Sequence, residues 1–362
     1  MKNLIVFITL ILIAAGISFA VPFLPSVGGK ASKADRENYK KRAYNYDGKV
    51  FHNDPEVSVM EKVEDNDSAR MSGNGTRPDF ELPVRKPQID NNPDESNFSI
   101  TWLGHSSLFM QMHGKNILVD PVFSERISPV TWIGPKKFSN PSITIEELPE
   151  IDILILTHDH YDHMDYRALK KLAPKVNKYV VPLGVECHLR KWKFDMEKIS
   201  NMAWWEEIES DGIMIAATPA QHFSGRWITG RNETLWNGYV LKDVHRQIFL
   251  SGDSGYGEHF KKIHEKYGDF DLAVMECGQY NVRWPSIHSF PEQSVQEAID
   301  VGAKLAMPVH WGAIVLSTNG WDDSVLRFVK AAEEKKLDYI TPYLCETVDI
   351  LNPQNYREQW WK

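Results

Sequence analysis

From Phe98 onward, short apolar runs alternate with polar turns along the chain. Runs of about four to eight β-branched or aromatic residues are typical of strands, and apolar residues three or four positions apart are typical of helices. The strands predicted from this pattern are 99–103, 107–112, 117–119, 151–156, 179–181, 212–218, 235–241, 247–250, 272–275 and 305–309. The predicted helices are 164–172, 256–267, 291–301 and 322–335. Strand pairs come first, followed by strand–helix alternation, and this order occurs twice. Two sheets packed face to face with helices outside would explain this pattern.

The start of the chain differs, because residues 4–24 form one apolar stretch without a charge. About 20 apolar residues can cross the hydrocarbon core of a bilayer as a helix. Lys2 and the small residues Ser18 and Ala20 also fit a secretory signal that is cleaved. We therefore expect a membrane-associated protein, held by an uncleaved anchor unless the segment is removed during export. The side of the membrane stays open, since a signal-like start favours export, whereas a cytoplasmic domain is favoured by the basic residues Lys30, Lys33 and Arg36.

Residues 25–97 are polar, charged and interrupted by Gly and Pro, a composition typical of a spacer with little intrinsic structure. Tyr44, Tyr46 and Phe51 indicate that part of this spacer packs on the main domain. The predicted organisation is an N-terminal segment 1–24, a spacer 25–97 and a main domain 98–362.

Charge and cysteine content narrow the classes of function. The formal net charge of −8 argues against a nucleic-acid-binding surface, which normally needs a basic patch. The three cysteines are widely spaced and odd in number, so they predict neither a disulfide framework nor a CxxC metal site.

The most informative stretch is residues 157–163, THDHYDH, which directly follows a predicted strand. In extended backbone His158 and His160 point the same way, so both can bind one cation. Asp162 and His163 follow the turn and can face a second cation. The chain has only 13 histidines, so three of them this close together indicate a metal site rather than a polar surface loop. Four such donors do not make a closed structural zinc site, so further ligands must come from elsewhere.

This HxHxDH motif after a strand resembles the metallo-β-lactamase superfamily, whose later motifs follow in the expected order. They offer three more ligands, which are His222 in TPAQHFSG, Asp253 in SGDSG and His310 in PVHWG. The resemblance covers roughly residues 98–351. It implies an α/β (α+β) fold, an αββα sandwich of two mixed sheets with outer helices.

The implied ligand set would bind two divalent metal ions. His158, His160 and His222 would hold one ion, and Asp162, His163 and His310 the other, with Asp253 bridging them. Nitrogen and oxygen ligands suit Zn²⁺, with Mn²⁺ or Fe²⁺ as alternatives. Two ions about 3.5–4 Å apart lower the pKa of a shared water and stabilise charge in the transition state, so the expected chemistry is hydrolysis.

Within the superfamily, several stretches are similar to the branch that contains N-acylphosphatidylethanolamine-hydrolysing phospholipase D. They are TWLGHSS at 101–107, DPVFS at 120–124, IGPK at 133–136, AQHFSGR at 220–226, SGYG at 254–257 and YNVRW at 280–284. The resemblance implies a phosphodiesterase that acts on N-acylphosphatidylethanolamine or a related phospholipid. The alternatives are a lactonase or other small-ester hydrolase of the ascorbate-phosphate lactonase-like type, and a non-catalytic metal-binding module.

The same resemblance suggests further site residues. His288 is expected to contact a substrate oxygen or to protonate the leaving group, which makes it a predicted catalytic residue beside Asp253. His105 and Asp120 are expected next to the ligands, where Asp120 would orient a ligand imidazole. Arg226, Tyr280, Arg283 and Trp284 are expected either to support the ligands or to contact substrate. The expected partners are a lipid or other small molecule and a membrane, without nucleic acid, and a homodimer is left open.

Overall fold

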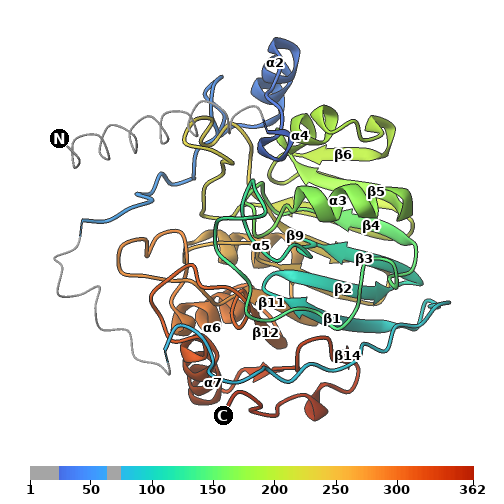
Figure 1. The fold of residues 1–362 in the computed structure, drawn as a ribbon, viewed down its shortest axis with the longest axis vertical. Coiled ribbons are helices and arrows are strands. Elements are labelled where there is room, and N and C mark those ends of the chain that lie inside the picture. The colour runs from blue at the N-terminus through green and yellow to red at the C-terminus, as the bar shows by residue number, and fades with distance from the viewer. Residues whose placement is uncertain (1–23, 63–74) are drawn as a thin grey trace, which may run out of the picture.

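The computed structural model describes residues 24–62 and 75–362, and two β-sheets packed face to face form its centre (Figure 1). The first sheet has seven strands in the order β14-β1-β2-β3-β4-β5-β6. Their bounds are β1 (Phe98–Gly104), β2 (Ser107–Met112), β3 (Lys115–Val119), β4 (Ile151–Ile155), β5 (Val176–Pro182), β6 (Ile199–Met202) and β14 (Thr347–Asp349).

The second sheet also has seven strands, in the order β13-β12-β11-β10-β9-β8-β7. Its parallel part runs from β10 to β13, and its antiparallel part from β7 to β10. The strands are β7 (Glu207–Ser210), β8 (Ile213–Thr218), β9 (Gly238–Lys242), β10 (Gln247–Leu250), β11 (Leu272–Glu276), β12 (Leu305–Val309) and β13 (Asp338–Tyr339).

Helices cover the outer faces of both sheets. The first sheet carries α3 (Tyr166–Leu172) and α4 (Val185–Lys191). The second sheet carries α5 (His259–Tyr267), α6 (Pro291–Asp300) and α7 (Asp323–Lys335). Short 3-10 helices lie at Pro25–Val27, Ala173–Lys175, Met196–Lys198 and Pro353–Asn355. The predicted sandwich of two mixed sheets with outer helices is therefore confirmed.

Strand β4 illustrates why the central strands are largely apolar, with the half-buried Asp152 as the exception in this strand. Ile153 and Ile155 face the apolar layer between the sheets, whereas Leu154 and Leu156 face the layer beneath α3 and α4. A strand buried on both faces needs apolar residues at every position rather than at alternate ones. The rigid strand then carries the polar THDHYDH loop at its carboxyl end.

The strands that precede the predicted site residues all run in one direction. In the first sheet β1 and β3 both pair antiparallel with β2, and β3 pairs parallel with β4. In the second sheet β8 and β10 both pair antiparallel with β9, while β10, β11 and β12 are parallel. Their carboxyl ends therefore meet at one edge of the sandwich.

Several predicted element bounds were wrong. The strand expected from residue 235 begins at Gly238, because Leu235 and Asn237 donate their backbone N–H groups to Leu183 and Thr157 in loops of the first sheet. The helix expected from residue 256 begins at His259. The short elements α4, β6 and β7 were not predicted, since fewer than eight residues carry little periodic signal.

Among the described residues that precede the first sheet, residues 24–62 are more ordered than their composition predicted. We call residues 24–62 the N-terminal arm. It contains α2 (Lys33–Arg42), which begins with a capping box between Ser32 and Asp35. Tyr46 and Phe51 are buried as expected, whereas Tyr44 is 61% exposed. The expectation of low intrinsic structure was therefore wrong for this part of the spacer.

The predicted membrane segment lies almost entirely outside the described residues, which begin at Leu24. Within residues 24–62 and 75–362, no helix is both long and apolar enough to cross a bilayer.

Candidate metal centre

Loops at the shared edge bring the seven predicted ligands together. The loop after β4 supplies four of them, and the loops after β8, β10 and β12 supply one each. All but His160 are buried, and the set is His158, His160, Asp162, His163, His222, Asp253 and His310. Rigid strand ends thus place polar side chains where a cation can replace the water they lose on burial.

Three imidazoles form one side of the centre, which we call the histidine half. His160 Nδ1 lies 2.9 Å from His158 Nε2 and 3.2 Å from His222 Nε2. Two nitrogens from the loop after β4 and one from the loop after β8 therefore converge on one point.

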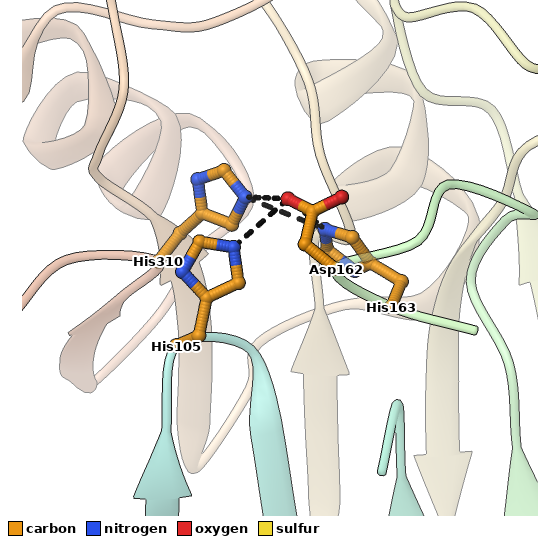
Figure 2. A group of neighbouring side chains, drawn as sticks. All are labelled: His105, Asp162, His163 and His310. Carbon is orange, nitrogen blue, oxygen red and sulfur yellow. Dashed lines mark hydrogen bonds and ion pairs between the residues drawn. The ribbon is translucent and has the colours of Figure 1, made fainter. Parts of the chain in front are cut away.

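A carboxylate and two imidazoles form the other side, which we call the carboxylate half. Asp162 Oδ2 lies 3.7 Å from His163 Nε2 and 3.5 Å from His310 Nε2, and these two nitrogens are 3.3 Å apart. Figure 2 shows this group with His105, whose Nε2 lies 2.9 Å from the same Asp162 oxygen.

Asp253 lies between the two halves. Its Oδ2 is 3.2 Å from the Nε2 atoms of His163 and His310, 3.7 Å from that of His222 and 3.9 Å from that of His158. Its Oδ1 is buried without a hydrogen-bond partner. A buried carboxylate oxygen without a donor is costly unless a cation binds it, so this arrangement suits a bridging ligand.

These residues fit a pair of divalent ions. Ligands about 2.0–2.2 Å from one tetrahedral ion lie roughly 3.3–3.6 Å from one another. Most donor–donor distances in the two halves are close to that spacing. Imidazole and carboxylate donors without thiolates suit Zn²⁺, Mn²⁺ or Fe²⁺.

Neighbouring groups fix the ring nitrogen that each histidine offers. Asp120 Oδ2 lies 2.7 Å from His163 Nδ1 and also accepts the Thr157 hydroxyl at 2.6 Å. Because the carboxylate only accepts, Nδ1 of His163 carries the proton and Nε2 is the ligand. His222 likewise donates from Nδ1 to the Ile287 carbonyl at 3.0 Å, which leaves its Nε2 for a metal.

Charge in the centre is balanced by protons when no cation is bound. Burial alone would lower the pKa of His163, but the carboxylates of Asp253, Asp162 and Asp120 outweigh it and raise this pKa to about 10. In the histidine half burial holds the pKa of His158 and of His222 well below the usual range, so both rings are neutral. Metal binding must therefore displace protons mainly from the carboxylate half.

A cavity of about 280 Å³ opens beside the centre. Its polar wall consists of His160, Asp162, Asp253, His288 and His310. The other lining residues are Val59, Met60, Phe223, Arg231, Gln279, Trp284, Ile287 and Leu316. The structure thus brings predicted residues His288 and Trp284 to the site, while Asp120 and His105 contact ligands from behind.

Three residues that were expected to support the ligands or to contact substrate lie outside this cavity. Arg226 does not reach this cavity, because its guanidinium donates to the carbonyls of Ser26, Asp159 and Met164 and thereby braces the THDHYDH loop. Tyr280 is fully buried and donates its hydroxyl to Asp323. Arg283 does not line the cavity among the residues described. Arg226 thus has the supporting role that was one of its two expected roles. Substrate contact by Tyr280 or Arg283 stays a prediction.

Other residues of the centre were not predicted. Glu276, at the carboxyl end of β11, places Oε1 3.3 Å from His310 Nδ1 and 3.4 Å from His288 Nδ1. Its position after a predicted parallel strand was a usable signal. Arg231 at the rim and Asn53 in the arm had no such signal, because neither belongs to a recognisable motif.

Comparisons with known proteins agree with this geometry. A family model described as the beta-lactamase superfamily domain matches residues 115–311, more than half of the chain. An uncharacterized protein of Mycobacterium tuberculosis is 34% identical over 291 residues, which cover 79% of this chain and 77% of that protein. A Caenorhabditis elegans protein named N-acyl-phosphatidylethanolamine-hydrolyzing phospholipase D 1 is 33% identical over 279 residues, covering 71% of this chain and 77% of the worm protein.

Among solved structures, the metallo hydrolase Igni18 of Ignicoccus hospitalis aligns with a TM-score of 0.54 over 70% of this chain and 98% of its own. At 18% identity this likeness concerns the fold alone. The sequence matches go further, because they combine the family model with relatives aligned over most of their length. The chain belongs to the metallo-β-lactamase superfamily of metal-dependent hydrolases, and its relatives there include a protein named as an N-acylphosphatidylethanolamine-hydrolysing phospholipase D.

Proposed function

We propose that this metal-dependent hydrolase is a phospholipase D-type phosphodiesterase acting on N-acylphosphatidylethanolamine or a closely related phospholipid. The observation that carries the proposal is the lining of the cavity, which combines a polar wall of four metal ligands and His288 with a mostly apolar wall that reaches the surface. The name of the worm relative supports the same substrate class.

The two walls suit an amphiphile with an anionic group. Met60 and Leu316, on the apolar side, are 55% and 36% exposed. Arg231 lies at the same rim, with its guanidinium 4.6 Å from the Phe223 ring centroid. A cavity of about 280 Å³ is too small for a whole phospholipid. We therefore expect the phosphodiester to enter and the acyl chains to cross the apolar rim.

The reaction proposed is cleavage of the bond between phosphorus and the head-group oxygen by water. Two divalent ions on the seven ligands would supply an activated water and neutralise charge on the phosphoryl oxygens. Arg231 attracts the anionic phosphodiester to the rim. Glu276 faces Nδ1 of His288 at 3.4 Å, so the opposite ring nitrogen is the one available to protonate the departing alkoxide.

We also propose that the apolar segment 4–24 holds the enzyme on a membrane. Where the described chain begins, Ser26 donates its hydroxyl to the Pro129 carbonyl at 2.7 Å. The loop that follows exposes Trp132 at 68% and Ile133 at 56%. Aromatic and aliphatic side chains next to the point where an apolar segment joins the domain suit a lipid surface. Deleting residues 1–24 should release the protein from membranes and leave hydrolysis of a soluble substrate intact.

The substrate is tested with metal-loaded protein and a synthetic N-acylphosphatidylethanolamine in ¹⁸O-labelled water. The label should appear in the phosphatidic acid product. His288→Ala should lower turnover more than it lowers metal content, whereas Asp253→Ala should lower both.

The same preparation should then be offered lactones and small esters. Absence of turnover on any phospholipid, together with rapid lactone opening, would replace the phospholipase proposal with the lactonase alternative. Absence of all hydrolysis by protein that binds two ions would point to a metal-binding module.

A further inference from the structure

We infer that Asn53, in the N-terminal arm, is a positioning residue of the metal centre that fixes the backbone of the ligand His222. Asn53 Nδ2 donates to the His222 carbonyl at 2.8 Å, and the His222 N–H donates to Asn53 Oδ1 at 3.0 Å. One side-chain amide thus satisfies both the backbone N–H and the backbone carbonyl of a single ligand residue. The two residues are 169 positions apart in the chain.

The pairing matters because His222 lies in a loop rather than in a strand. It follows β8, which ends at Thr218, so no ladder of backbone hydrogen bonds holds it there. Its side chain is fully buried, and Asn53 is only 9% exposed. Without Asn53 the N–H and carbonyl of His222 would lose their partners in a place that water reaches poorly.

Together with Ile287, Asn53 leaves His222 little freedom. The Ile287 carbonyl holds ring nitrogen Nδ1 at 3.0 Å, and Asn53 holds the peptide at two points. The remaining polar atom, Nε2, then faces His160 Nδ1 at 3.2 Å in the histidine half. Groups behind a metal ligand set its orientation and so the affinity of the site.

The arm itself is firmly attached, so it can serve as a support. Arg42 donates from Nε to Glu206 Oε1 and from Nη1 to Asn201 Oδ1, each at 2.9 Å. Tyr39 is fully buried and donates to Glu186. Close to Asn53, the Phe51 N–H donates to the Asn232 carbonyl at 2.8 Å. Asn53 is therefore presented by packed structure.

Beyond Asn53 the arm continues along the cavity. Val59 and Met60 line it, and the Glu61 N–H donates to the Arg283 carbonyl at 2.6 Å. The arm thus contributes both a support for a ligand and part of the apolar wall. The inference about Asn53 concerns metal binding alone and does not depend on which substrate is cleaved.

The test compares Asn53→Ala with Asn116→Ala, a matched control. Asn116 is 7% exposed and donates its side-chain amide to the Glu150 carbonyl at 2.9 Å. It lies at the amino end of β3, whereas the metal centre lies at the carboxyl ends of the strands. Metal-free proteins are titrated with ¹¹³Cd²⁺, followed by cadmium NMR and by competition with a chromophoric chelator. Asn53→Ala should lower the binding affinity for one of the two cadmium ions by about 10- to 100-fold and shift the resonance of that ion. The other resonance should stay as in the wild type and in Asn116→Ala.

The inference would be overturned if folded Asn53→Ala protein bound both ions as tightly as the wild type does. It would also be overturned if the affinity for both ions fell equally. Should the alanine variant fail to fold, Asn53→Asp decides. It keeps the volume and the acceptor for the His222 N–H but turns a carboxylate toward the carbonyl, so it too should weaken one ion. Wild-type binding of both ions by Asn53→Asp would equally overturn the inference. Because no substrate is present, the result is independent of the phospholipase proposal.

Discussion

The two halves of the metal centre have different supports behind their ligands. In the carboxylate half, Asp120 lies 2.7 Å from His163 Nδ1 and Glu276 lies 3.3 Å from His310 Nδ1. In the histidine half the partners are neutral. His158 Nδ1 lies 3.0 Å from the Thr157 hydroxyl, and His222 Nδ1 lies 3.0 Å from a backbone carbonyl.

This difference indicates which half of the centre should bind its ion more tightly. A carboxylate behind an imidazole makes the ring a more basic ligand and adds negative charge near the cation. The carboxylate half should therefore take up the first ion. The histidine half, which depends on neutral partners and on Asn53 in the arm, should take up the second. Asp253 belongs to both, so it should couple the two binding events.

The largest effect is expected where the halves meet. Asp253→Ala removes the oxygen that lies 3.2 Å from both His163 and His310. Activity should fall on the order of 10³-fold or more, since one ligand to both ions is lost. Metal analysis should find fewer than two ions per chain, while circular dichroism stays unchanged. Two tightly bound ions in this variant would show that the halves are independent and that Asp253 is no bridge.

The second prediction separates the halves directly. Asp120→Asn keeps the size of the side chain but removes the charge behind His163, so the first ion should bind about 10- to 100-fold more weakly. Asp243→Asn is the control, because this carboxylate is also buried but accepts backbone N–H groups in the turn after β9. In cadmium NMR, Asp120→Asn should shift one of the two resonances. It should be the resonance that Asn53→Ala leaves unchanged. A shift of the same resonance by both variants would abolish the distinction between the halves.

The third prediction concerns Glu276, which connects the carboxylate half to the cavity. Glu276→Gln keeps the shape but removes the charge shared by His310 and His288, so kcat should fall about tenfold with a smaller loss of metal affinity. Glu297→Gln is the control, because Glu297 is also buried but lies outside the cavity lining, and burial raises the pKa of its carboxyl well above the usual range. An unchanged kcat with weakened metal would restrict Glu276 to supporting His310.

Much of this centre could be predicted from sequence because its ligands follow strands. The apolar run of β4 and the THDHYDH loop behind it are adjacent in the chain, so a local pattern carries both fold and chemistry. Asp120 was predictable for the same reason, as it directly follows β3. The backbone strain there was not, although His105, Asp120 and His310 all adopt positive φ angles, as residues at functional sites often do.

The supports from distant segments could not be predicted. Asn53 meets His222 across 169 positions, and a lone asparagine in a polar segment gives no sign of it. The motif that contains Arg226 likewise left open whether this side chain supports the ligands or contacts substrate, and in the structure it braces backbone carbonyls of the ligand loop. Side-chain direction in a loop depends on tertiary packing, and motif membership does not reveal it.

The smallest effect is expected outside both halves, at Tyr280. Its hydroxyl donates to Asp323 and accepts from Arg327 Nη1 at 3.1 Å, away from the cavity. Tyr280→Phe should therefore change kcat and KM by less than about twofold, yet lower the free energy of unfolding by about 1–3 kcal/mol, since a buried charged partner loses a hydrogen bond. Trp284→Ala, four residues later and lining the cavity, should instead raise KM several-fold. Steady-state kinetics and urea unfolding of the pair separate the two roles. Lost activity with unchanged stability in Tyr280→Phe would mean that the functional site extends beyond the two halves and the cavity beside them.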